Sequence, residues 1–138
     1  MKSVLHLIFL FALILLFSCE DSMYVTNCDE CEEEEPVTTT LAAELDPDYS
    51  AGVVVMLWEG RLEDNIRIDS TKSFSGTYNK KVSLNRTYTV TAIYIKGNKI
   101  YTSVDSTTPR IRYTEDMCDE PCYYVYDKQL DLRLKYTK

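Results

Sequence analysis

From residue 37 onward the chain carries short runs in which apolar and polar residues alternate. Leu130–Tyr136 is the clearest run, since every second residue from its start is apolar and the residues between them are mostly charged. Alternate side chains of a strand point to opposite faces, so this pattern is typical of a strand with one buried face. Tyr88–Tyr94 repeats the alternation. Val53–Trp58 is apolar throughout, which places it in the middle of a sheet.

The same patterning extends along the chain and predicts nine strands, whereas no stretch shows the 3.6-residue period of a helix. Gly97-Asn98 predicts a tight hairpin, because Gly and Asn tolerate positive φ, and Asp46-Pro47-Asp48 predicts a turn. Short strands at this spacing indicate an all-β fold, a β-sandwich or a barrel. The predicted strands are Thr38–Leu45, Gly52–Glu59, Asn65–Asp69, Ser75–Leu84, Thr87–Ile95, Lys99–Asp105, Arg110–Tyr113, Cys122–Tyr126 and Leu130–Tyr136.

The segment Val82–Tyr94 is similar to one corner of known β-sandwiches. It resembles the corner between strands E and F of immunoglobulin-like and fibronectin-III-like domains, a pattern that transthyretin-like sandwiches share. The resemblance implies that Tyr88 is a tyrosine corner, whose hydroxyl bonds back to the main chain. It therefore implies a single β-sandwich, immunoglobulin-like or transthyretin-like, and carries no activity with it.

The N-terminal residues have the features of an export signal. Lys2 is soon followed by the run Val4–Phe17, which is apolar apart from His6. Fourteen helical residues span about 21 Å, which is less than the roughly 30 Å hydrocarbon core of a bilayer. The run therefore fits the apolar core of a signal peptide better than a membrane-spanning helix.

The apolar run ends in Leu16-Phe17-Ser18-Cys19, which resembles the lipobox of bacterial lipoproteins. The resemblance implies cleavage before Cys19 and acylation of that residue, so that lipid holds the mature protein at the cell envelope, in the outer membrane. Since the rest of the chain has no apolar run of spanning length, lipid at Cys19 is the expected anchor. We divide the chain into a lipoprotein signal peptide (1–18), an acidic tether (19–36) and a β-sandwich domain (37–138).

The charge of the chain excludes several functional classes. It has 15 Lys and Arg against 22 Asp and Glu, a formal net charge of −7, and its single histidine, His6, lies in the predicted signal peptide. DNA and RNA bind to basic footprints, which an acidic surface does not supply. A mature chain without imidazole has no Ser-His-Asp or Cys-His catalysis. We expect no enzymatic activity, no cofactor and no nucleic-acid partner.

Four cysteines form two close pairs, Cys28 with Cys31 and Cys118 with Cys122. In an exported protein they favour structural disulfides, and we favour bonds between the two pairs, which would attach the N-terminal segment to the loop that carries the second pair. Each such bond closes a loop of about 90 residues, worth about 4.5 kcal/mol. A Cys₄ zinc site is the alternative. A redox motif is disfavoured, because the neighbouring carboxylates raise the pKa of a thiol.

Two further groups of residues are candidates for ligand contact or modification. Tyr123, Tyr124 and Tyr126 form the densest aromatic cluster, and exposed flat rings can stack on sugars, although strand packing uses tyrosine more often. Three triplets that begin with Asp-Ser resemble the acceptor sequence of an O-glycosylation system of some anaerobic Gram-negative bacteria. That resemblance implies modification at Ser22, Ser70 and Ser106.

These features together lead to a functional expectation. The chain is expected to be an envelope-anchored lipoprotein that acts as a non-catalytic structural or protein-interaction module, with the membrane and an envelope protein as partners. An exposed edge strand could pair with another chain. The alternative is a small glycan- or ligand-binding accessory lipoprotein of a nutrient-uptake system, which a surface row of free aromatic rings would favour.

Overall fold

The computed structural model describes residues 27–49 and 51–135, so Cys19, Ser22 and Tyr136 lie outside the described residues. The described chain forms nine strands and two three-residue 3₁₀ turns, η2 (Cys28–Glu30) and η3 (Leu62–Asp64). The strands are β1 (Thr38–Glu44), β2 (Val53–Glu59), β3 (Ile66–Ser73), β4 (Thr77–Ser83), β5 (Tyr88–Lys96), β6 (Lys99–Thr107), β7 (Arg110–Thr114), β8 (Cys122–Tyr126) and β9 (Gln129–Asp131).

Seven of the strands form the two layers of a β-sandwich, which confirms the predicted all-β fold. One sheet has the order β4-β1-β9 and the other the order β3-β2-β5-β6. All pairs are antiparallel except β1 with β9, which run parallel. The predicted hairpin at Gly97-Asn98 joins β5 to β6, and Gly97 adopts a φ of +59°.

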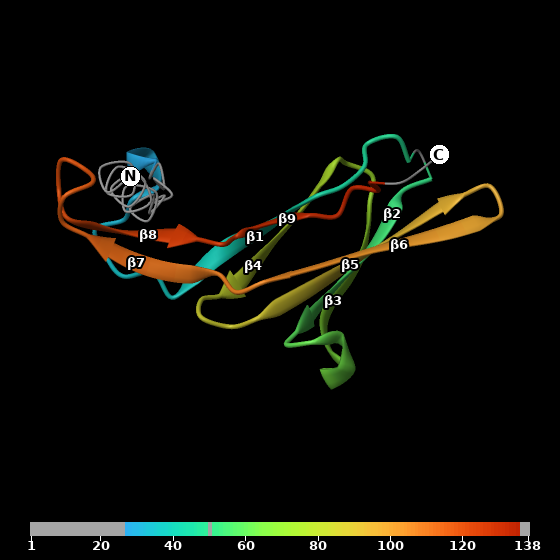
Figure 1. The fold of residues 1–138 in the computed structure, drawn as a ribbon, viewed down its shortest axis with the longest axis horizontal. Coiled ribbons are helices and arrows are strands. Elements are labelled where there is room, and N and C mark those ends of the chain that lie inside the picture. Colours follow the sequence, from blue (N-terminus) through green and yellow to red (C-terminus); the bar gives the residue numbers. More distant parts are fainter. Residues whose placement is uncertain (1–26, 50, 136–138) are drawn as a thin grey trace, which may run out of the picture.

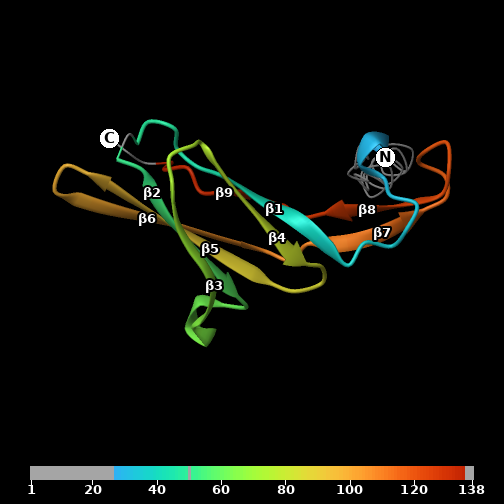
Figure 2. The ribbon, with the colours of Figure 1, turned by 180° about the vertical axis from the view of Figure 1, so that it is seen from behind.

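β7 and β8 form a separate two-stranded ribbon that projects from one end of the sandwich (Figures 1 and 2). The chain runs on from β6 into β7 without reversing direction, and it returns through β8 into β9. The N-terminal end of the described chain lies beside this ribbon, whereas the β5–β6 hairpin tip forms the opposite end of the molecule (Figure 1). The ribbon therefore brings the two cysteine pairs together, far from the hairpin tip.

The core lies between the two sheets and follows the alternation of the sequence. Leu41, Val55, Leu57, Val90 and Tyr94 all have an exposed fraction of 0%. Burial of a large aliphatic side chain contributes about 1.5–3 kcal/mol, so these inward positions decide which side of each strand faces the core. The inward series of β5 predicted from the sequence is buried throughout.

Tyr94 carries the largest fully buried side chain and keeps its hydroxyl satisfied. The hydroxyl donates to the carbonyl oxygen of Leu132 at 2.8 Å and accepts from the amide of Asp46 at 3.3 Å. An unpaired buried hydroxyl would cost about 1–3 kcal/mol. These two bonds tie β5 to the chain that follows β9 and to the turn that follows β1.

Tyr88 has the hydrogen bonds expected of a tyrosine corner. Its ring is buried at the start of β5, and its hydroxyl both donates to the carbonyl oxygen of Ser83 and accepts from the amide of Ser83, each at 3.1 Å. Between these residues the chain turns through Asn85, whose φ is +60°. The prediction that the hydroxyl bonds back to the main chain is confirmed.

Two strand ends differ from the predictions by more than two residues. β3 extends four residues beyond the predicted end at Asp69, because an edge strand with both sides near water does not need apolar alternation to pair. The last strand is shorter, since its pairing ends at Asp131, where the carboxylate accepts from the amide of Arg133 at 3.2 Å and turns the chain. The alternation of burial nevertheless continues, with Leu132 buried and Leu134 half-buried.

An aspartate closes each open side of the sandwich. On the β3–β4 side, Asp69 accepts from the hydroxyl of Tyr78 at 2.8 Å and pairs with Lys80 at 3.2 Å. On the β6–β9 side, Asp105 accepts from the amide of Asp131 at 3.1 Å. Both carboxylates reach from an edge strand of one sheet to the edge strand of the other, so each contributes to holding the two layers together.

Asp69→Asn is expected to lower the free energy of unfolding at neutral pH by about 1–2 kcal/mol, because it removes a charge-assisted hydrogen bond. The Tyr78 hydroxyl and the Lys80 ammonium hold the pKa of Asp69 below its usual value of 3.8. A carboxyl with a depressed folded pKa stabilises the fold above its unfolded pKa, and this stabilisation disappears as the pH falls through the folded pKa. The difference between the two proteins should therefore be constant above about pH 5 and shrink below about pH 4.

Urea denaturation at a series of pH values measures this difference. Asp119→Asn, in an exposed loop, is the matched control and should change the free energy of unfolding by less than about 0.5 kcal/mol. A constant difference between wild type and Asp69→Asn down to the acid limit would contradict the assigned role of the carboxylate.

Candidate interaction surface

Two disulfide bonds attach the N-terminal segment to the β7–β8 ribbon. Cys28 is bonded to Cys118 and Cys31 to Cys122, with Cα–Cα distances of 5.8 and 5.6 Å. This is the pairing between clusters that the sequence analysis favoured. The zinc alternative uses the same four sulfur atoms and would require all of them as thiolates.

Backbone and side-chain contacts reinforce this attachment. The amide of Glu32 donates to the carbonyl oxygen of Tyr123 at 2.8 Å, and the amide of Tyr123 donates to Glu32 at 2.7 Å, so the segment pairs with the free edge of β8. Glu30 forms an ion pair with Lys128, and the hydrogen bond from Lys128 lowers the pKa of Glu30. The acidic segment predicted as a tether is therefore fixed from Cys28 onward, which its charge alone did not indicate.

The tyrosines of β8 are largely engaged in packing. Tyr124 is buried with 7% exposed, while Tyr123 and Tyr126 are half-buried. The ring of Tyr123 lies 4.9 Å from that of Tyr113, and the ring of Tyr124 lies 6.2 Å from that of Tyr126. Strand alternation divides the three predicted residues between the two faces of the ribbon, so they do not form one aromatic row.

The side of the β3-β2-β5-β6 sheet that faces away from the core is unusually apolar. We call it the outer face. Its exposed residues include Ile95, Ile100 and Val104, with exposed fractions of 54%, 70% and 50%. The third sheet, the β7–β8 ribbon, projects from one end of the sandwich, and the described residues form no further sheet and no helix longer than one turn that could pack over this face. The apolar members of the outer face are Val54, Met56, Trp58, Ile93, Ile95, Ile100 and Val104.

The centre of the outer face is tightly packed. Thr89 and Thr91 point outward from β5, yet each is only 6% exposed. The indole N–H of Trp58 donates to the Thr91 hydroxyl at 3.4 Å, and the guanidinium of Arg67 lies 5.9 Å from the Trp58 ring. The sequence patterns did not predict this surface, although the run Val53–Trp58, apolar on both sides of its strand, is a signal for it.

β6 is the least protected edge of the sandwich. Natural edge strands avoid pairing with other chains through bulges, lysines or short length. β3 has a bulge and carries Arg67 and Lys72, β4 carries Lys80 and Lys81, and β9 has three residues. β6 has nine residues in regular register with β5, no proline, and a single charge between its ends, Asp105.

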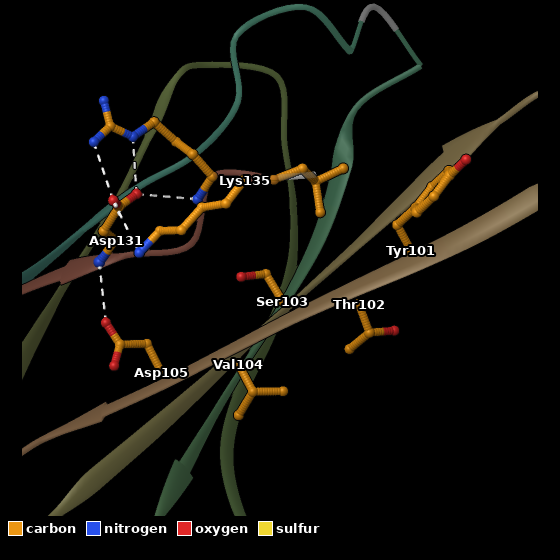
Figure 3. A pocket seen from close by; sticks show the side chains of 9 residues that line it. Tyr101, Thr102, Ser103, Val104, Asp105, Asp131 and Lys135 are labelled. Atoms are coloured by element: carbon orange, nitrogen blue, oxygen red, sulfur yellow. Dashed lines mark hydrogen bonds and ion pairs between the residues drawn. The ribbon is translucent and has the colours of Figure 1, made fainter. Parts of the chain in front are cut away.

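A cleft of about 450 Å³ opens between β6 and the chain at and after β9 (Figure 3). Tyr101, Ser103 and Asp105 lie on the side of the cleft, whereas Thr102 and Val104 point the opposite way, toward the outer face. The far wall consists of Asp131, Arg133, Leu134 and Lys135.

The charges of this far wall pair with one another. Asp131 accepts from the Nε of Arg133 at 2.8 Å and lies 3.7 Å from the Nζ of Lys135, and Arg133 also contacts Glu44 at 3.2 Å. The hydrogen bonds from Arg133 hold the pKa of Asp131 well below its usual range. Asp131 therefore acts as an ion-pair partner of Arg133 and Lys135 in this wall.

The two described serines of the Asp-Ser-Thr triplets occupy equivalent places. Ser70 on β3 and Ser106 on β6 are both exposed on the outer-face side of their edge strands. The aspartates that precede them are Asp69 and Asp105, which point inward and close the sandwich. The repeated triplet thus has a structural explanation, and glycosylation at these serines stays a prediction.

No family model, curated protein or solved structure matches the chain. Within residues 27–49 and 51–135, no helix is long and apolar enough to cross a membrane.

Loss of one disulfide should lower the free energy of unfolding much less than loss of both. The first bond closes a loop of about 90 residues, worth about 4.5 kcal/mol in the chain-entropy model. Once the first bond has formed, the second bond closes only a small ring. This ring consists of residues 28–31 and 118–122, and its closure is worth about 2.5 kcal/mol. Replacing Cys31 and Cys122 by Ser should therefore lower the free energy of unfolding by about 2.5 kcal/mol, and replacing all four cysteines by about 7 kcal/mol.

Urea denaturation of the two variants and the wild type measures these differences. The variant in which Cys28 and Cys118 are replaced is the matched control, because either remaining bond closes the long loop equally well. A loss of more than about 4 kcal/mol on removal of a single bond would contradict the nested arrangement.

Proposed function

We propose that this protein is a lipid-anchored, non-catalytic interaction module of the bacterial cell envelope. The observation that carries the proposal is the apolar outer face of the four-stranded sheet, which ends at the unprotected edge of β6. Monomeric soluble proteins seldom expose a contiguous apolar patch beyond a few hundred Å², and larger ones mark interaction sites. The partner that fits such a face is another protein.

The size of the outer face suits a protein contact. The four strands are seven to nine residues long, and at a spacing of about 4.8 Å they present a face of roughly 500 Å². A standard protein interface takes about 800 Å² from each partner, so the face supplies most of one side. Its central packing around Trp58 and Thr91 keeps the surface rigid, which reduces the entropy lost on binding.

The anchoring part of the proposal rests on the lipobox residues Leu16-Phe17-Ser18-Cys19. The disulfides limit the distance between the folded domain and an anchor at Cys19, because only eight residues separate Cys19 from Cys28. An extended chain of that length reaches about 30 Å at most. A lipid at Cys19 would therefore keep the β7–β8 end of the molecule close to the membrane and the β5–β6 hairpin farther from it.

The alternative, a glycan- or ligand-binding accessory protein of a nutrient-uptake system, has less support. It requires aromatic rings with free faces, and Tyr124 is buried while Tyr123 and Tyr126 pack against neighbouring rings. The exposed ring of Tyr113 is what remains in its favour. Binding of the purified protein to specific sugars on a glycan array would support this alternative.

Growth of expressing cells on labelled palmitate tests the anchor. The wild-type protein should carry label and sediment with membranes, whereas Cys19→Ala should carry none and leave the membrane fraction. Ser22→Ala, three residues further on, is the control and should behave as the wild type. An unlabelled wild-type protein, or Cys19→Ala that still sediments with membranes, would contradict the proposal.

A photoreactive amino acid placed at Val54 tests the interaction role in the same cells. Val54 lies on the outer face, and Asn79 lies exposed on the outer side of the other sheet and serves as the control position. A discrete cross-linked protein should appear from Val54 and be absent from Asn79. No adduct at Val54, or equal adducts at both positions, would contradict an interaction through the outer face.

A further inference from the structure

The main-chain groups of β6 point alternately toward β5 and toward open solvent. In a two-residue hairpin the residues that flank the turn, here Lys96 and Lys99, form a hydrogen-bonded pair. The even-numbered residues of β6 from Ile100 then direct their N–H and C=O groups away from β5. Ser106 agrees with this assignment, since its amide donates to the side chain of Asp105 at 2.9 Å. The edge offered to another strand therefore begins at Ile100 and ends before Ser106.

We propose that a second copy of this chain pairs with this edge, β6 against β6 in antiparallel orientation, with Thr102 on the two-fold axis. The inference rests on the proposed interaction role and adds a second contact to it, at the edge where the outer face ends, so the outer face itself stays open to another protein. A two-fold contact requires a surface that is complementary to itself. β6 meets this requirement in its side chains as well as in its main chain.

One register matches charge and hydrophobicity at the same time. With Thr102 opposite the partner's Thr102, Ile100 lies opposite the partner's Val104 on the outer-face side. On the cleft side, Lys99 lies opposite the partner's Asp105. Opposite charges and paired β-branched residues both stabilise antiparallel strands.

Other registers lose this match. When Val104 or Ile100 lies on the axis instead, the same main-chain groups can still pair, but Lys99 no longer lies opposite the partner's Asp105. A shift by one residue turns the apolar positions to the cleft side. The Thr102-centred register is therefore the one that the sequence of β6 specifies.

The cleft and the outer face both fit this arrangement. Ser103 lies opposite the partner's Tyr101, which would enter the cleft between β6 and the ion-paired residues Asp131 and Arg133. On the other side, the two outer faces become one continuous surface of an eight-stranded sheet. Antiparallel pairing also sends the two β7–β8 ribbons to opposite ends of the dimer, so neither obstructs the contact.

Cysteine cross-linking of the full-length protein in membranes tests the pairing directly. Thr102→Cys places two thiols across the axis, at a Cα–Cα distance of about 5.5 Å, so mild oxidation should give a disulfide-linked dimer. Ser106→Cys is the control, because it is equally exposed on the same side of β6 but lies about 27 Å from its counterpart in this register. A dimer from Thr102→Cys and none from Ser106→Cys supports the proposal. Equal yields, or no dimer from either, overturn it.

Sedimentation of the detergent-solubilised protein provides the second readout. Lys99→Glu sets like charges opposite each other at two symmetric places and should raise the dimer dissociation constant at least about tenfold, while Lys96→Glu, on β5, should leave it unchanged. Thr102→Pro removes an N–H that β5 does not use, so it should abolish the dimer and keep the monomer folded by circular dichroism. A wild-type protein that stays monomeric up to about 1 mM overturns the proposal.

Failure of the dimer and failure of the proposed function give different results. A monomer that is still labelled at Cys19 and still yields an adduct at Val54 would retain the interaction role of the outer face and lose only the contact between two copies. Loss of both the label and the adduct would remove the proposed function itself.

Discussion

Burial of one side of the β3-β2-β5-β6 sheet against β4-β1-β9 fixes which residues make up its other side. Val55 and Leu57 must face the core, and the strict alternation of β2 then places Val54 and Met56 outward. The apolar outer face thus follows from a strand that is apolar at every position from Val53 to Trp58, although burial of the inner side does not by itself require apolar residues outside. A sequence that only needed to fold would have placed polar residues there. This contrast is the physical basis for assigning an interaction role to that face.

The N-terminal segment stabilises the part of the domain that projects from the sandwich, the β7–β8 ribbon. The β7–β8 ribbon makes no ladder with either sheet, and an isolated two-stranded hairpin is only marginally stable in water. The two disulfides and the Glu32–Tyr123 pairing add a third strand-like segment to it. The same bonds convert a segment that would otherwise extend through charge repulsion into part of the folded domain.

Much of the fold could be predicted from the sequence, because burial and turn chemistry are local signals. The alternation of β5, the hairpin at Gly97-Asn98 and the bonding of Tyr88 were all predicted, as was disulfide pairing between the two clusters. The parallel pairing of β1 with β9 was not predicted, since it joins segments that are far apart in the chain. The length of β3 was also missed, because an edge strand with few buried residues carries no alternation.

The candidate site was less predictable than the fold. The density of tyrosines in β8 predicts a ligand contact there, yet these rings pack against neighbouring rings of the ribbon. The Asp-Ser-Thr triplets predict modification at their serines, which stays a prediction, and the structure adds that their aspartates bridge the sheets through Tyr78 and Asp131. The outer face could not be predicted because it depends on which strands are neighbours. The sequence patterns predict the strands but not the pairing of β2 with β5.

Hydrogen exchange of individual backbone amides in the membrane-anchored protein, compared with dilute protein in detergent, tests the open edge of β6 most directly. The amides of Tyr101 and Ser103 face β5 and should be protected under both conditions. Those of Thr102 and Val104 should exchange freely in dilute detergent and become protected in the membrane. Free exchange of Thr102 and Val104 in both states would contradict a partner strand at β6, and protection in both would mean that this edge is closed within the single chain.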